Sequence, residues 1–226
     1  MPFGLKLLAP PSVEPVTVEI AKSHLRLEPA FTDDDALLGV YIMAARQYVE
    51  GHTHRAIYSQ QWLMTLDYFP WYNFSGTAPT GSRSDAVLAS FWRGLEIKLP
   101  KPTCVSVDLI TYTDTDGNVV TVPPSAYCVD VVSEPARIVP IAGSFWPTAP
   151  QYLPGSVQIT FTAGTYGDGV DVNNCPSTIR LAMLLLIAHW YEHREVVSEQ
   201  ALKQVPLAVD SLLESEMFTA FTLESN

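Results

Sequence analysis

The sharpest pattern that could do chemistry is the run His189-Trp190-Tyr191-Glu192-His193. It fits H-x-x-E-H, in which two histidines on one helix face bind zinc and the glutamate acts as a base. Such a site needs a third protein ligand, and the later acidic residues Glu195, Glu199, Asp210 and Glu214 have no distinctive spacing. A histidine near the end of a helix also complements the helix dipole. We therefore favour a structural role for these histidines and keep a metal-dependent hydrolase as the alternative.

Three other short patterns have simpler structural interpretations. His52-Thr53-His54 follows Gly51 and could bind a metal only with ligands from elsewhere, so it is interpreted as a solvated turn behind a helix. Asp114-Thr115-Asp116-Gly117-Asn118 has Ser125 where a calcium loop needs glutamate, which favours a hairpin turn. The glycine-rich run 163–169 has no phosphate-binding frame. We expect no catalytic residue, no metal ligand, no cofactor and no enzymatic activity.

The composition points to assembly with copies of the same chain. The length of 226 residues suits one ordinary domain or a domain with an insertion, and is too short for two full-size domains. Apolar residues make up 47% and charged residues only 16%, whereas a typical soluble domain has roughly 25% charged residues. So little charge predicts that neighbouring subunits cover part of the surface. The net charge of −11 argues against electrostatic binding to the phosphates of nucleic acid.

The cysteines indicate assembly in a reducing cytoplasm, and the apolar runs are too short to cross a membrane. Cys104, Cys128 and Cys175 are widely spaced and odd in number, so no disulfide framework is expected. The first six residues lack the layout of a signal peptide. The longest apolar run, 181–188, is far shorter than the roughly 20 residues that cross a bilayer. We therefore expect no membrane partner.

Helical patterns occupy both ends of the chain. Thr17 can cap a helix that runs to Arg26, and Glu28-Pro29 ends it. A longer helix begins at the cap Thr32-Asp33-Asp34-Asp35, and Gly51 is its expected stop. Its apolar residues recur at helical spacing, namely Leu37, Leu38, Tyr41, Ala44, Ala45, Tyr48 and Val49.

The C-terminal helical pattern is apolar on every side. Ser177 is the expected cap, and Ile179, Met183, Leu186, Ile187, Trp190 and Tyr191 line one face. Leu181, Leu184, Leu185 and Ala188 make the other face apolar, so another element or another subunit must bury it. A last short helix runs from Pro206 to about Glu214.

A β-rich middle separates the two helical regions. Apolar residues alternate with more polar ones over 62–68, 95–99, 105–109 and 157–161, which is typical of half-buried strands. Asp116-Gly117 predicts a hairpin between 107–113 and 119–122. Further short strands are expected at 126–131 and 136–140. Proline and glycine separate these strands, which favours a small antiparallel sheet or barrel.

The fold class is therefore α+β, with about four helices and an antiparallel β-rich domain inserted between two helix pairs. The expected boundaries are an N-terminal helical part at 1–55, the inserted domain at 56–170, a C-terminal helical part at 171–214 and a tail at 215–226. Residues 69–94 show no periodicity and are rich in aromatic side chains. They form either a contact loop or a cover over the sheet, and the candidate contact residues are Trp71, Tyr72, Phe74, Phe91 and Trp92.

The order of the segments resembles the head-tail connector (adaptor) family of tailed bacteriophages. The resemblance covers about 16–214, although segment 69–94 is short in the family. Its carriers are Val16 through Arg26, the Asp33-Asp34-Asp35 cap with Ala44 through Glu50, Ile97 through Pro102, the Asp116-Gly117-Asn118 hairpin, Val157 through Gly164, and Pro176 through Glu195.

This resemblance implies a structural virion protein at the head-tail junction, assembled in the bacterial host cytoplasm. It implies a ring of twelve copies below the portal, which extends the DNA channel and docks the next neck or tail component. DNA is expected to pass through the lumen without sequence-specific binding. Apolar residues of the last helices and the tail are the candidate contacts with other subunits or the portal: Leu184, Leu185, Trp190, Tyr191, Leu207, Leu212, Leu213, Phe218 and Phe221.

Overall fold

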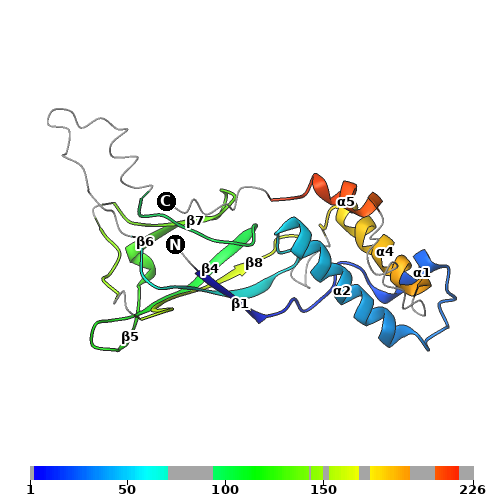
Figure 1. Cartoon of the computed structure of the whole chain (residues 1–226), viewed down its shortest axis with the longest axis horizontal. Coiled ribbons are helices and arrows are strands. Elements are labelled where there is room, and N and C mark those ends of the chain that lie inside the picture. Colours follow the sequence, from blue (N-terminus) through cyan, green and yellow to red (C-terminus); the bar gives the residue numbers. More distant parts are fainter. Residues whose placement is uncertain are drawn as a thin grey trace. The chain divides into compact units, whose positions relative to one another are not determined.

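The computed structural model describes residues 3–70, 94–142, 144–149, 153–167, 174–193 and 207–218 (Figure 1). The chain divides into two compact units. The sheet unit takes its described residues from Met1–Ala9 and Gln61–Ala163, and the helical unit takes them from Pro10–Gln60 and Gly164–Thr219. The predicted α+β class is confirmed, because helices and antiparallel strand pairs both occur along the described chain.

The first helix of the helical unit, α1 (Val18–Leu25), begins where the sequence predicts it. The hydroxyl of Thr17 accepts a hydrogen bond from the backbone nitrogen of Ile20 at 3.3 Å, as an N-cap should. Arg26 takes a left-handed conformation with φ 59° and ends the helix before Pro29 is reached.

The long helix α2 (Asp35–Thr53) differs from its predicted bounds at both ends. Its first helical hydrogen bond joins the nitrogen of Leu38 to the oxygen of Asp34, so Asp34 rather than Thr32 is the cap. Gly51 does not stop the helix, because the left-handed residue is His54, with φ 58°. The expected solvated turn at 52–54 was therefore wrong, since His52 and Thr53 are helical.

Two more helices complete the described helical unit, α4 (Ser177–Glu192) and α5 (Leu207–Glu214). The cap of α4 is Pro176, whose oxygen accepts a hydrogen bond from the nitrogen of Arg180 at 3.1 Å, so the prediction of Ser177 as the cap was wrong. α4 packs against α1, α2 and α5. One buried cluster joins the four helices, with Ala21, Leu38, Ile42, Val49, Ile179, Met183, Leu186, Ile187, Val209 and Leu213 among its members.

The sheet unit holds two sheets. A five-stranded sheet has the order β1-β2-β8-β4-β5, and a three-stranded sheet has the order β3-β7-β6. The strands are β1 (Phe3–Ala9), β2 (Gln60–Leu66), β3 (Ile97–Lys98), β4 (Cys104–Thr113), β5 (Val119–Thr121), β6 (Tyr127–Asp130), β7 (Arg137–Pro140) and β8 (Val157–Ala163), and a 3-10 turn (Pro124–Ala126) precedes β6. β1, which pairs antiparallel with β2, has no counterpart among the predicted strands.

Aromatic side chains connect the two sheets. The rings of Phe69 and Trp146 stack with centroids 5.0 Å apart, and Phe69 also meets Tyr112 of β4 edge-on at 5.8 Å. Trp146 lies 6.5 Å from the ring of Tyr127 on β6. Its indole nitrogen donates to the oxygen of Leu95 at 2.7 Å, which satisfies the polar end of a buried ring. Phe69, at the start of segment 69–94, therefore belongs to the core of the sheet unit.

The predicted hairpin between β4 and β5 is confirmed. Gly117 has φ 86°, a conformation that glycine adopts without steric cost. One oxygen of Asp114 accepts hydrogen bonds from the backbone nitrogens of Asp116 (2.9 Å) and Asn118 (2.8 Å). These backbone donors, Asn118 foremost, lower the pKa of Asp114. Asp114 thus organises a turn between strands.

Within the described part of the chain, no helix combines the length and the apolar character that crossing a membrane requires.

Two glycines provide a matched test of the fold. A Cβ atom on Gly164, which has φ 103°, would lie 2.1 Å from the oxygen of Tyr58, whereas a Cβ atom on Gly51 would meet nothing within 4 Å. Gly164→Ala should lower the free energy of unfolding by at least about 1–3 kcal/mol from backbone strain alone. Gly51→Ala, inside α2, should raise it by about 0.5–1 kcal/mol. Urea unfolding measures the free energy of unfolding of both variants. An equal change in this free energy for the two variants would contradict the structure.

Thiol modification provides a second test. Cys104 and Cys175 are buried and Cys128 is exposed. Burial raises the pKa of Cys104 to about 11 and that of Cys175 to about 12, which keeps both as unreactive thiols at pH 8. A chromogenic thiol reagent should therefore modify Cys128 rapidly in the folded protein and all of the cysteines after denaturation. Rapid modification of Cys104 or Cys175 in the folded protein would contradict this burial.

Candidate subunit interface

The predicted contact residues of α4 lie beside the core of the helical unit. Leu184, Leu185, Trp190 and Tyr191 are partly buried and pack against the four-helix cluster. Trp190 lies beside Tyr41 of α2, with ring centroids 6.2 Å apart. Leu181, on the other face of α4, is 43% exposed in the single chain, so burial of this face by another subunit stays a prediction.

Two of the predicted contact residues of α5 and the tail are buried within the chain itself. Leu213 and Phe218 are buried, Leu212 is half-buried, and Leu207 is the first residue of α5. The nitrogen of Phe218 donates to the oxygen of Thr53 at 2.9 Å, and the guanidinium of Arg55 lies 5.8 Å from the centroid of the Phe218 ring. We therefore leave Leu213 and Phe218 out of the interface proposed below.

Several predicted contact residues lie outside the described residues: Trp71, Tyr72, Phe74, Phe91, Trp92 and Phe221.

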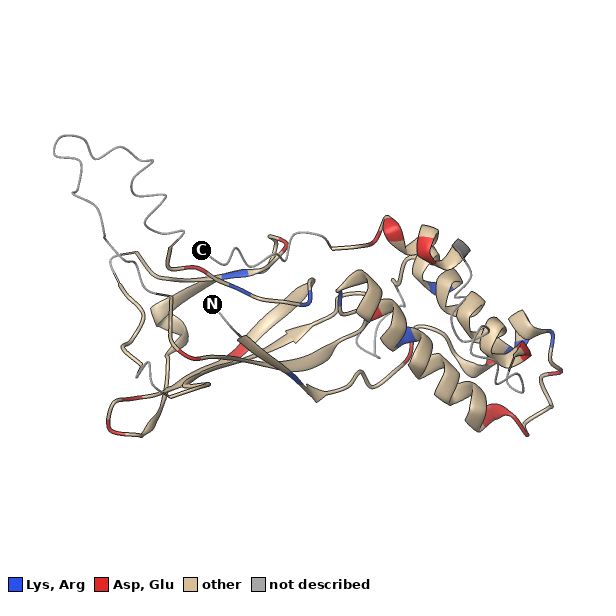
Figure 2. Ribbon diagram, in the orientation of Figure 1, with Lys and Arg blue, Asp and Glu red and all other residues tan. Residues whose placement is uncertain are grey.

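The outward face of α2 is the exposed apolar surface that sequence reasoning missed. Val40 is 54% exposed and Met43 is 45% exposed. Ala36 and Gln47 are also exposed, one helical turn before Val40 and one turn after Met43. We call Ala36, Val40, Met43 and Gln47 the outward face of α2. It contains no ionisable side chain, and Figure 2 shows α2 uncoloured by charge over most of its length.

The charged side chains in the middle of α2 point into the helical unit. The guanidinium of Arg46, a residue only 4% exposed, donates to Glu14 through Nε and to Glu50 through Nη1, each at 2.8 Å. The other oxygen of Glu50 accepts hydrogen bonds from the nitrogen of Ile57 at 3.0 Å and from Nε2 of Gln60 at 2.6 Å. Burial raises the pKa of Glu14, and the neighbouring Arg46 acts against that rise.

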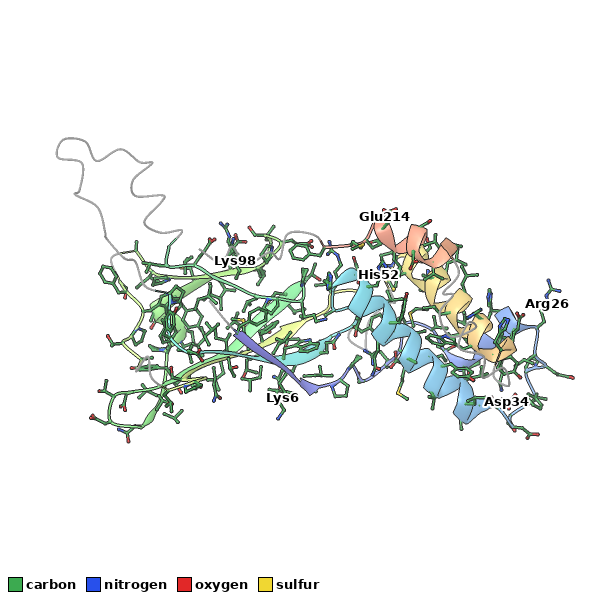
Figure 3. The ribbon with its side chains drawn as sticks, in the orientation of Figure 1. Lys6, Arg26, Asp34, His52, Lys98 and Glu214 are labelled. Atoms are coloured by element: carbon green, nitrogen blue, oxygen red, sulfur yellow. The ribbon has the colours of Figure 1, made fainter. Side chains whose placement is uncertain are left out.

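Polar side chains also meet at both ends of α2, which Asp34 and His52 mark in Figure 3. At the first end, the ammonium of Lys22 lies 2.6 Å from Asp35, and the hydroxyl of Tyr191 donates to Asp34 at 2.5 Å. These contacts connect α2 to α1 and α4. At the other end, His52 lies 3.5 Å from a carboxylate oxygen of Asp210 on α5.

The two histidines of the H-x-x-E-H pattern lie close together. The ring centroids of His189 and His193 are 4.6 Å apart, and Nδ1 of His193 lies 2.8 Å from the oxygen of His189. His193 caps the C-terminus of α4, and Glu192 is its last helical residue. Across the described ranges, no group of three or more His, Cys, Asp or Glu side chains gathers that could hold a metal ion.

The small number of charged residues in α2, taken together with its apolar pattern, could have predicted an apolar outward face. The helix has only three residues of the types Asp, Glu, Lys and Arg, namely Asp35, Arg46 and Glu50. A pattern of apolar residues alone does not reveal that Arg46 and Glu50 are buried, because their partners Glu14 and Gln60 lie outside the helix. The geometry therefore suits a helix whose outer side contacts another apolar surface.

Comparison with known proteins confirms the resemblance found in the sequence. The sequence model of the phage gp6-like head-tail connector proteins matches residues 15–77, which include α1 and α2. No curated protein sequence matches the chain.

Solved structures with the same fold come from gene transfer agent (GTA) particles, and two of the three are structures of the neck. A chain in the neck of an empty GTA particle, computed with C6 symmetry, is 23% identical, with 95% of each chain covered and a TM-score of 0.66. A chain of the native GTA virion is 23% identical, with 94% of each covered and a TM-score of 0.66. A third, from the native neck computed with C12 symmetry, is 20% identical, covers 93% of this chain and 95% of that chain, and has a TM-score of 0.58.

The buried ion network leads to a stability prediction. Arg46→Met leaves the carboxylates of Glu14 and Glu50 without their shared cation, and removing one partner of a buried pair costs about 3–5 kcal/mol. Burial already raises the pKa of Glu14, and without Arg46 nothing of that pair acts against the rise. A carboxyl group whose pKa is raised by folding contributes stability below its unfolded pKa and loses it as the pH rises. The loss relative to wild type should therefore be larger at pH 8 than at pH 5.

Arg137→Met is the matched control for this experiment. Arg137 pairs with Asp130 at the surface, where the two side chains are 44% and 36% exposed. Urea unfolding should show a much smaller effect for this variant, because water screens exposed pairs. Equal destabilisation by the two variants would show that Arg46 is not a buried partner.

Proposed function

We propose that the chain is a structural subunit of a tailed-bacteriophage virion neck, a head-to-tail connector whose copies assemble into a closed ring. One observation carries the proposal: α2, a helix of 19 residues, buries Arg46 and Glu50 and exposes Val40 and Met43. A helix in contact with water normally has the opposite arrangement. Since charge is depleted at the centre of protein interfaces, a neighbouring copy is the natural cover for this face.

Two comparisons support a neck role. The family pattern matched over residues 15–77 is that of head-tail connector proteins. The matched structures are chains of GTA necks, solved with C6 and C12 symmetry. A ring made by repeating one contact around an axis would give each copy two different lateral surfaces.

In finer terms, we propose a ring of twelve copies at the head-tail junction, between the portal and the next neck or tail component. Its lumen would continue the DNA channel without reading sequence. The net charge of −11 supports this role, because carboxylates that face a lumen repel the phosphates of duplex DNA and let it slide. The ring assembles in the host cytoplasm and functions in the virion.

A charge placed on the outward face of α2 tests self-assembly. Val40→Glu should leave the monomer folded, because Val40 is 54% exposed, and should abolish ring formation, because the carboxylate would be buried without a partner in the contact. Sedimentation velocity measures assembly, and circular dichroism measures folding. Val132→Glu is the matched control, since Val132 is 90% exposed in the sheet unit. Normal rings from Val40→Glu would contradict the assignment of this face.

A further inference from the structure

We infer that the outward face of α2 in one copy packs against the outward face of α4 in the next copy. The outward face of α4 consists of the exposed Leu181 and of Leu184, Leu185 and Ala188 beside it, which are only partly buried by the chain's own core. This inference rests on the proposed ring and names the two surfaces that form its repeating contact.

The two faces are built by the same local arrangement. In α2, the exposed Val40 stands between the buried residues Leu38 and Ile42. In α4, the exposed Leu181 stands between the buried residues Ile179 and Met183. A shift of two residues turns a side chain roughly 200° around a helix, so both exposed side chains point away from the shared core. Each helix therefore has one apolar face inside the unit and one outside.

Electrostatics restricts what can cover these faces. The outward face of α2 has no ionisable side chain, and between Arg180 and Glu192 α4 carries only His189 among its ionisable side chains other than tyrosine. A nucleic acid or a charged partner would lose hydration there and gain no ion pair. An uncharged apolar surface is therefore the cover that matches these faces. The outward face of α4 is such a surface for α2, and the outward face of α2 is such a surface for α4.

The position of the faces favours a contact between unlike surfaces. α2 and α4 pack against each other and contribute to one buried cluster, so their outward faces lie on different sides of the helical unit. In Figure 1, α2 runs along one side of this unit and α4 runs along the other with α5. A contact between unlike faces can repeat from copy to copy and close into a ring, whereas an α2-to-α2 contact would stop at a dimer.

The lengths of the helices also match. α2 has 19 residues and α4 has 16 residues. At 1.5 Å per residue, these correspond to about 28 Å and about 24 Å of helix. The outward face of α2 runs from Ala36 to Gln47 and that of α4 from Leu181 to Ala188, about 16 Å and about 10 Å at the same rise per residue. The shorter face can thus lie along the longer one over its whole length.

Crosslinking between engineered cysteines tests the pairing. The background is the full chain with Cys128→Ser, which removes the exposed native thiol and leaves the buried Cys104 and Cys175. Val40→Cys and Leu181→Cys are introduced together and singly, and a bifunctional maleimide with a span of about 10 Å, one helix diameter, is added to the assembled protein. Met43→Cys with Leu184→Cys is the second pair, used if the first pair prevents assembly in sedimentation.

The predicted result is a ladder of crosslinked species for the double variant, because each copy then links to two neighbours. A mixture of the two single variants should give dimers alone, and each single variant by itself should give no crosslink. Crosslinked dimers from Val40→Cys alone would show that like faces meet. Rings that form without any crosslink from either pair would overturn the pairing but leave the proposed function intact. A background chain that stays a single particle at every concentration would overturn the proposed function itself.

Discussion

Burial of charge inside the helical unit is the constraint on which the rest of the structure depends. Arg46 is held between Glu14 and Glu50, and Glu50 also accepts hydrogen bonds from Ile57 and Gln60. Buried charges need such partners, because an unpaired ion loses its hydration without compensation. This network fixes the rotation of α2 about its axis. The same rotation places Val40 and Met43 outside, so the inward charges and the outward apolar face are two consequences of one arrangement.

The sheet unit has its named ion pair at the surface, and it also exposes apolar side chains such as Val119 (74%) and Val132 (90%). Its two sheets meet at the aromatic group of Phe69, Tyr112, Tyr127 and Trp146, which fills the space between β4 and β6. Its exposed ion pair, Asp130 with Arg137, and the turn at Asp114 lie where water surrounds them. The helical unit differs because one helix, α2, buries the charged Arg46 and Glu50 and exposes the apolar Val40 and Met43. This arrangement connects the fold to the proposed assembly.

The sequence predicted the elements whose signals are local. These elements depend on residues that are neighbours in the chain: the cap at Thr17, the 3.6-residue spacing in α2, the hairpin at Asp116-Gly117, and the short strands β6 and β7. β1 was missed because its place is set by pairing with the distant β2. Candidate contacts were predicted on α4, α5 and the tail, where apolar residues are densest. The outer face of α2 was missed because its spacing looks like that of any amphipathic helix, and the partners that turn Arg46 inward, Glu14 above all, lie elsewhere in the chain.

Peroxide oxidation of methionine tests the central claim, that a second copy covers the outward face of α2, most directly. Met43 is 45% exposed in the single chain, whereas Met64 is 2% exposed and Met183 is fully buried. Mass spectrometry of the oxidised peptides follows each methionine as the protein concentration is raised through assembly. The account predicts rapid oxidation of Met43 in the dilute protein and protection of Met43 in the assembled protein, with Met64 and Met183 slow throughout. Rapid oxidation of Met43 in fully assembled rings would contradict it.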